Sequence, residues 1–217
     1  MDWISLAAEK RARYERSHGD RDERAIVRLG NTAYAAGLAL LMAGDDEGSA
    51  WLRRAAARWR ESWDVGGARD TWGRPIGALK ASLLAGDDAA VEELARWTLE
   101  LGAATAESPI GRYAGTLALL ALGRWAEARH VAQSLRSESG FPRDVADALE
   151  ATAAGDGGRY ARAVRSVVAS FETRGEHLED VPVADTALAL QALAGRRGLD
   201  CSLPHSSVLP SAPALPQ

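Results

Sequence analysis

Proline and glycine punctuate the sequence in a way that predicts a series of helices. Four segments begin with Pro and end with Gly about three helical turns later, namely Pro75–Gly86, Pro109–Gly123, Pro142–Gly155 and Pro182–Gly195. Proline suits the first position of a helix because the N–H that it lacks would be unsatisfied there and its φ is already helical. Glycine just beyond the end can take the left-handed conformation that closes a helix. Each segment is therefore expected to form one helix.

A second helix is expected after each of the first three segments. Trp125, Ala128, Ala132 and Leu135, for example, are spaced so that they share one face of an amphipathic helix. The earlier segment Asp22–Gly44 closes on glycine in the same way. The closing glycines recur every 32 to 42 residues, a period typical of α-solenoids and of compact arrays of helical hairpins.

These patterns predict an all-α fold of about ten helices that pack as an array of antiparallel hairpins. The expected helices span residues 2–17, 22–43, 47–64, 75–85, 88–102, 109–122, 124–138, 142–154, 158–173 and 182–195. One helical domain is expected over residues 1–198. Residues 199–217 hold four prolines, and they should form a short extended tail that is partly disordered.

The composition narrows the class of protein and of partner. A single cysteine among 217 residues excludes a disulfide framework and any cysteine-based zinc module. A net charge of −4 argues against nucleic acid as a partner, because nucleic-acid-binding proteins usually present a basic face. No apolar run reaches the ~18 residues that a membrane span needs, and the N-terminal stretch lacks the layout of a signal peptide. We therefore expect a soluble cytoplasmic protein that does not bind membranes.

The densest group of candidate binding residues lies in Trp51–Arg74, which holds four Trp and six Arg. These two residue types dominate the hot spots of protein interfaces. The sequence therefore predicts a surface for a protein partner, formed by Arg58, Trp59, Arg60, Trp63, Trp72 and Arg74. The other interpretation is a core face of tryptophans whose neighbouring arginines extend into solvent. Stacking of single-stranded nucleic acid is less favoured, because nearby acidic residues dilute the positive charge.

A second candidate site is an acidic patch of Glu176, His177, Glu179 and Asp180. The four histidines of the chain lie far apart and form no zinc motif, so no metal site is predicted and a solvated helix end is the default interpretation. Cys201, the one thiol, has no base placed near it, and no catalytic residue is predicted. The sequence carries no phosphate-binding or dinucleotide-binding loop, and no cofactor is predicted.

Two stretches resemble the turn and second helix of a tetratricopeptide-type repeat. They read GRWAEARHVAQSL over Gly123–Leu135 and GGRYARAVRSVV over Gly157–Val168, with Tyr160 in the place of Trp125. The resemblance covers residues 75–173, and the family's full pattern of spaced Trp, Leu, Gly, Tyr, Ala and Pro is not satisfied. It implies a tetratricopeptide-like bundle or solenoid that binds segments of other proteins in a groove, without catalysis.

The C-terminal stretch His177–Pro210 is similar to the close of some all-helical immunity proteins of polymorphic toxin systems. Those proteins also end with an alanine-rich helix, a Gly turn, a short extended stretch and a Leu-Pro. The resemblance implies a small cytoplasmic protein that neutralises a toxin by binding it.

The favoured function is therefore non-enzymatic binding of another protein, with immunity-type inhibition as one form of it. The alternative is an all-helical enzyme or small-ligand-binding protein whose pocket combines arginine, tryptophan and carboxylates.

Overall fold

The computed structural model describes residues 1–17, 19, 22–66, 71–199 and 201–211. Over these residues the chain forms ten α-helices, two 3-10 helices and no strand, which confirms the predicted all-α fold. The helices are α1 (Trp3–Ser17), α2 (Glu23–Ala43), α3 (Glu47–Gly66), α4 (Gly73–Ala85), α5 (Asp88–Glu100), η1 (Ala103–Thr105), α6 (Pro109–Ala121), α7 (Trp125–Arg136), α8 (Arg143–Ala154), α9 (Gly157–Glu172), η2 (Leu178–Asp180) and α10 (Asp185–Arg196). Each α-helix begins and ends within three residues of its expected bounds. The end of the predicted tail, 212–217, lies outside the described residues.

Glycine closes the helices much as the sequence predicts. Gly44, Gly86 and Gly155 take left-handed φ values of 72°, 66° and 74° directly after α2, α4 and α8. Gly195 is an exception, because α10 continues through it to Arg196. The left-handed residue after α10 is Gly198, with a φ of 78°.

Proline opens only one helix in the predicted way. Pro109 is the first residue of α6, and the hydroxyl of Ser108 before it accepts a backbone N–H of the first turn at 3.1 Å. The other three prolines hold different positions, since Pro75 is the third residue of α4 and Pro142 and Pro182 lie before α8 and α10. All four still lie at or near a helix start, where a missing backbone donor does no harm.

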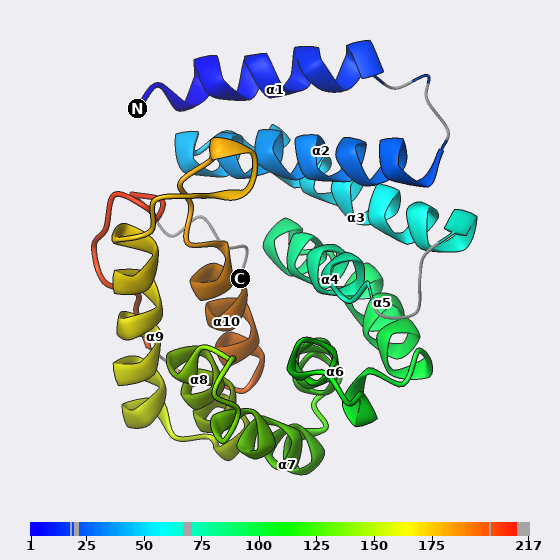
Figure 1. Cartoon of the computed structure of the whole chain (residues 1–217). Coiled ribbons are helices and arrows are strands. Elements are labelled where there is room, and N and C mark those ends of the chain that lie inside the picture. The colour runs from blue at the N-terminus through cyan, green and yellow to red at the C-terminus, as the bar shows by residue number, and fades with distance from the viewer. Residues whose placement is uncertain (18, 20–21, 67–70, 200, 212–217) are drawn as a thin grey trace.

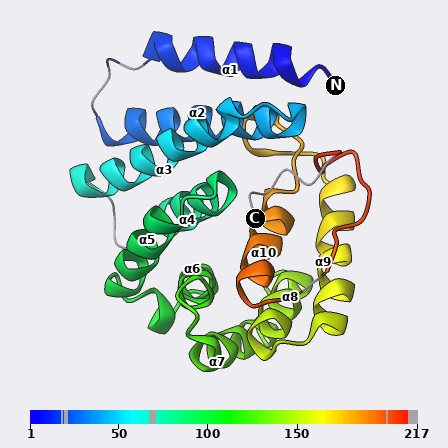
Figure 2. The same cartoon turned by 180° about the vertical axis from the view of Figure 1, so that it is seen from behind.

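The α-helices pack in two curved layers. The inner layer consists of α2, α4, α6 and α8, which are rich in Ala and Leu and bury most of their residues. The outer layer consists of α3, α5, α7 and α9, which bury one face each. Figure 1 shows the layers following an arc from α1 at the top to α9 at the left, and Figure 2 shows the same arc from behind. Burial of the apolar faces that meet between the layers holds the helices together.

The last helix, α10, lies inside this arc, where it contacts α4, α6, α8 and α9 (Figure 1). Its side chains Leu188, Leu190 and Leu193 are almost fully buried. The tail after α10 is extended and adds Val208 and Leu209 to the same core. Helix α10 and the tail therefore occupy the inside of the arc.

The start of α10 is three residues later than expected. Backbone hydrogen bonds run from the N–H of Val183 to the carbonyl of Val181 and from the N–H of Asp185 to the carbonyl of Val183, both at 2.9 Å, so this stretch forms tight turns and α10 begins at Asp185. The tail is fixed to the same place, because the N–H of Ala184 donates to the carbonyl oxygen of Val208 at 2.8 Å.

Helix α2 is long and apolar enough, by length and composition alone, to cross a membrane. Most of it is buried inside the protein, where it packs against α1 and α3. It therefore has the burial expected of a core helix.

Gly115 on α6 lies directly against the backbone of η1. A Cβ at Gly115 would come within 2.5 Å of the backbone N and Cα of Ala104. A backbone cannot rotate away as the end of a side chain can, so Gly115→Ala is expected to lower the free energy of unfolding by about 1–3 kcal/mol in urea titrations. Gly195→Ala is the matched control, because a Cβ there meets nothing within 4 Å, and it should raise stability by up to about 1 kcal/mol. Similar effects of the two changes would contradict the close approach of α6 to η1.

Candidate functional site

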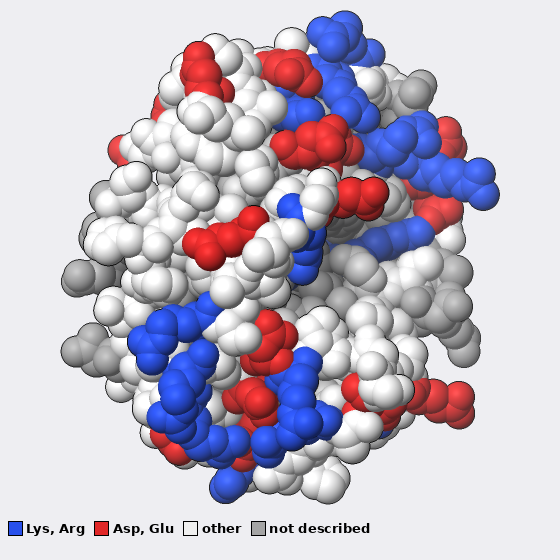
Figure 3. All heavy atoms as spheres, turned by 60° about the vertical axis from the view of Figure 1, so that its left-hand side comes forward, with Lys and Arg blue, Asp and Glu red and all other residues white. Residues whose placement is uncertain are grey.

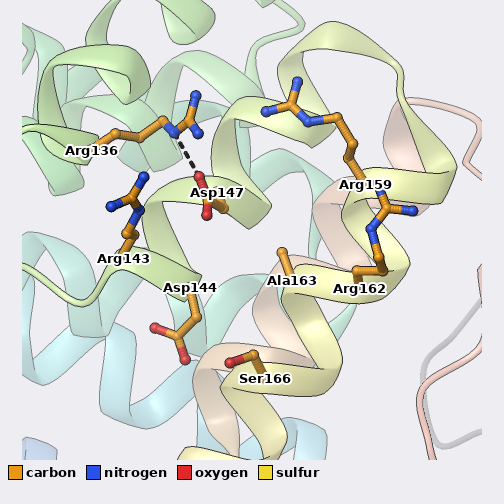
Figure 4. A pocket seen from close by; sticks show the side chains of 8 residues that line it. All are labelled: Arg136, Arg143, Asp144, Asp147, Arg159, Arg162, Ala163 and Ser166. Atoms are coloured by element: carbon orange, nitrogen blue, oxygen red, sulfur yellow. Dashed lines mark ion pairs between the residues drawn. The ribbon is translucent and has the colours of Figure 1, made fainter.

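A cleft lined by arginines opens between α7, α8 and α9, and it is called the arginine cleft below. Its volume is about 430 Å³. Figure 4 shows the eight side chains that line it, which are Arg136, Arg143, Asp144, Asp147, Arg159, Arg162, Ala163 and Ser166. In that view Arg136 and Arg143 lie on one side of Asp147, and Arg159 and Arg162 lie on the other.

Helix geometry brings these side chains together from three elements. Arg136 ends α7 and Arg143 begins α8, so the short connection between the two helices places them side by side. On α9, Arg159, Arg162 and Ser166 follow one another at spacings of three and four, which puts them on one face of the helix. That face is turned toward α8 (Figure 4).

Some of the arginines are held by carboxylates. Nε of Arg136 lies 2.6 Å from a carboxylate oxygen of Asp147. Glu150, whose side chain is only 2% exposed, accepts from Arg129 at 2.9 Å and also pairs with Arg159. Burial raises the pKa of Glu150, but hydrogen bonds from the two arginines and their positive charges outweigh this effect and lower the pKa below its usual value. Glu150 is therefore ionised and fixes the position of Arg159.

Two of the arginines remain without a counter-charge. Arg143 and Arg162 are exposed and form no ion pair with any residue that the structure describes. The remaining acid of the cleft, Asp144, accepts the backbone N–H of Val145 at 2.9 Å. Figure 3 shows basic side chains gathered around a few acidic ones on the lower part of the face that carries α9. Arg136 is balanced by Asp147 and Arg159 by Glu150. Arg143 and Arg162 then face one further carboxylate, that of Asp144, which leaves the arginine cleft with a small surplus of positive charge.

The arginine cleft is suited to binding oxyanions. A guanidinium group offers N–H donors in a planar fork that matches a carboxylate or a phosphate. Arg143 also lies in the first turn of α8, where the helix dipole favours a negative ligand. The chemistry available here is therefore recognition of negatively charged groups.

The six residues of the predicted partner surface differ in burial, since three are buried and three are partly exposed. Trp59, Trp72 and Arg74 are buried, with exposed fractions of 4%, 7% and 8%. The indole N–H of Trp59 donates to Oδ1 of Asn31 at 3.1 Å, and Arg74 pairs with Glu23. These three side chains belong to the interior, so the prediction that all six residues form one partner surface is wrong. Only Arg58, Arg60 and Trp63 can contribute to such a surface.

The other three residues of that surface keep part of their area in solvent. Trp63 is half-buried, with its ring edge-on to the ring of Trp97 at a centroid distance of 5.7 Å. Arg60 lies over the same Trp97 ring and pairs with Asp64. Arg58 donates to the hydroxyl of Tyr14 at 2.9 Å and pairs with Glu61. Each of these arginines is thus already engaged within the protein.

The acidic patch is dispersed around η2. Glu176 and Asp180 are exposed, His177 lies beside the ring of Phe171, and Glu179 pairs with Arg13 at 2.7 Å. Among the described residues, no group of three or more His, Cys, Asp or Glu side chains is arranged to hold a metal ion.

The residues of the arginine cleft were not selected from the sequence. A signal was present in α9, which carries Arg159, Arg162 and Arg165 at three-residue spacing and has no acidic residue before Glu172. The sequence pattern could not predict that Arg136 and Arg143 line the same cleft, because their positions depend on how α7 and α8 pack against each other.

Comparison with known proteins identifies no relative, so the proposed function is inferred from the geometry of the site. No protein-family model, no curated protein and no solved structure matches this chain.

Proposed function

We propose that this protein binds another protein by taking an acidic segment of it into the arginine cleft. The observation that carries the proposal is the pair Arg143 and Arg162, two exposed guanidinium groups of the arginine cleft that have no carboxylate partner among the described residues. Carboxylates of a partner would supply the missing counter-charges.

An acidic protein segment fits the arginine cleft better than a nucleic acid does. The cleft includes Asp144 and Asp147, which would repel a continuous run of phosphates. Carboxylates spaced along a peptide can instead meet Arg143 and Arg162 separately and leave the aspartates uncovered. Helix α10 occupies the inside of the arc, which also favours the outer surface as the place where a protein segment binds.

Neutralisation of a toxin is one form of this function. The C-terminal resemblance to immunity proteins supports it, and such an inhibitor acts in the cytoplasm by binding alone. An acidic surface on the toxin would then be the part that this protein covers.

The test is the affinity for a fluorescent 15-residue peptide of alternating Glu and Gly, measured by anisotropy. The double variant Arg143→Glu/Arg162→Glu is expected to weaken binding at least about 30-fold, because truncating interface arginines costs about 2 kcal/mol or more. Binding by the unchanged protein should also weaken as salt rises, since exposed charges are screened.

The matched control is Arg53→Glu, which changes the charge of an exposed arginine on α3 that does not line the cleft. It is expected to leave the affinity unchanged within a factor of two or so. If Arg53→Glu weakens binding as much as the double variant, the peptide is responding to overall charge, and the proposed site is wrong.

A further inference from the structure

A second hollow lies in the interior of the arc, between α2, α3, α4, α10 and η2. Its volume is about 450 Å³, which falls within the range of small-molecule sites. It is called the inner pocket below, and it is lined chiefly by Asn31, Tyr34, Trp59, Ile76, Lys80 and Asp185. It shares no lining residue with the arginine cleft.

Trp59 forms part of one wall of the inner pocket and is closely packed by its neighbours. The ring of Trp59 is pressed between two glycines, since a Cβ at either Gly30 or Gly77 would come within 2.8 Å of it. Ile76 extends this wall, and Leu178 on η2 lies at the rim with 49% of its area exposed. The walls therefore suit a flat or compact apolar body, which would also cover Leu178.

The acceptors at the floor of the inner pocket are already used. Oδ2 of Asp185 lies 2.6 Å from Nζ of Lys80 and accepts the hydroxyl of Tyr34 at 2.9 Å. Its other oxygen accepts the hydroxyl of Thr186 at 3.3 Å. Three of the roughly four acceptor positions of the Asp185 carboxylate are thus occupied, and its charge is balanced by Lys80, so it has little capacity left for a cationic ligand.

Donors, in contrast, remain in excess. Lys80 is 8% exposed and donates to Asp185 and to Thr186 (3.0 Å), so one of its three N–H groups has no partner in the described residues. The amide nitrogen of Asn31 forms no hydrogen bond there either, because only its oxygen is engaged, by Trp59. Arg74 does not add to this excess, because its terminal nitrogens are used by Glu23, which neutralises it, and by the backbone carbonyl of Ser62.

We propose that the inner pocket binds a small organic anion, a carboxylate attached to a flat apolar body. The apolar body packs against Trp59 and Ile76. The carboxylate accepts from the amide nitrogen of Asn31 and from the free N–H of Lys80. This activity is separate from the proposed binding of a protein segment, because it uses other residues.

Isothermal titration calorimetry with indole-3-acetate tests the proposal. The neutral indole-3-acetamide has the same apolar body and should bind at least tenfold more weakly, and the cationic tryptamine should not bind. Equal affinity for the acid and the amide would overturn the assignment to anions. Absence of binding by indole-3-acetate and by phenylacetate would overturn the pocket as an anion site.

Two variants test the location. Asn31→Asp keeps the oxygen that accepts from Trp59 and replaces the free donors by a negative charge, so affinity for indole-3-acetate should fall at least tenfold. Gly73→Leu places a side chain at a pocket-lining position where a Cβ meets nothing within 4 Å, and it should block binding by filling the space.

Two controls accompany them. Gly195→Leu makes the same change at an open helical position outside the pocket, and Arg143→Glu/Arg162→Glu removes the anion site of the arginine cleft. Both should bind indole-3-acetate as the unchanged protein does. Loss of binding in the arginine double variant, with Asn31→Asp unaffected, would overturn the inner pocket as the site. Thermal unfolding of each variant establishes that it is folded.

Discussion

Replacing Asp185 by asparagine is expected to lower the free energy of unfolding by about 3–5 kcal/mol. Asp185 and Lys80 form an ion pair in which the side chains are only 17% and 10% exposed. The amide fills the same space without a charge, so the ammonium group of Lys80 would stay buried with no counter-charge. Removing one partner of a buried pair is costly because the other charge remains out of water. Urea unfolding followed by circular dichroism measures the loss.

Lys80→Met provides the decisive comparison. In the unchanged protein it should be destabilising, because it leaves the carboxylate of Asp185 unpaired. In the Asp185→Asn background it should be stabilising, because it removes the unpaired ammonium group, while the amide can still accept from Tyr34. Glu92→Gln, which breaks the exposed pair with Arg96, should change nothing measurable. An equal loss from Lys80→Met in both backgrounds would mean that Lys80 and Asp185 are not coupled.

The pH dependence of this pair has a definite sign. Burial raises the pKa of Asp185, but the charge of Lys80 and the hydrogen bonds from Lys80 and Tyr34 outweigh it, so the pKa lies below its usual value of 3.8. The contribution of the pair is therefore complete above about pH 4. It is lost as the pH falls through the lowered pKa.

The helices of this protein could be predicted because their signals are local. A glycine such as Gly86 closes a helix through its own φ, and an apolar stripe marks a buried face whatever it packs against. The start of α10 was predicted less well. Backbone hydrogen bonds from Val183 to Val181 and from Asp185 to Val183 hold this stretch in tight turns, and a proline at 182 suits such turns as well as it suits a first helical turn.

The arrangement of the helices was harder to predict than their positions. The sequence indicated an array with the segment 182–195 as its last helix, but α10 lies inside the arc and contacts α4, α6, α8 and α9. The ion pair between Lys80 and Asp185 helps to hold it there. Pairing of residues so far apart in the sequence depends on the curvature of the whole array.

The tryptophan-rich segment shows why composition alone could not separate core from surface. Trp59 and Trp63 lie four residues apart on α3, yet one is buried between glycines and the other is half-exposed. The glycines that make room for Trp59 lie on α2 and α4, so the difference is set by the neighbouring helices. The arginine cleft was missed for a similar reason, since three helices contribute to it.

Raising the pH from 9 to 11 is expected to remove about 4 kcal/mol of stability, because three tyrosines are buried in the protonated state. Burial raises the pKa of Tyr34, Tyr113 and Tyr160 above the usual value of 10, and the charge of Asp185 adds to the effect at Tyr34 and Tyr113. A group with a raised pKa contributes fully below pH 10 and loses its contribution as the pH rises toward its folded-state pKa. At pH 11 each unfolded tyrosine has gained about 1.4 kcal/mol by ionising, whereas its folded counterpart has not.

Tyr160→Phe isolates this effect from the titration of other groups. Tyr160 donates to the side-chain oxygen of Gln191 at 3.1 Å, so its loss should lower stability by a similar amount at every pH up to 9. Between pH 9 and pH 11 the variant should then lose about 1.4 kcal/mol less than the unchanged protein, because one ionising group is gone. Denaturant titrations at the two pH values give both numbers, and absorbance at 295 nm reports when tyrosinate forms. If the buried tyrosines ionised in the folded protein at pH 11, the absorbance would rise before unfolding and the two proteins would lose the same stability. That result would mean that water reaches Tyr160 without global unfolding.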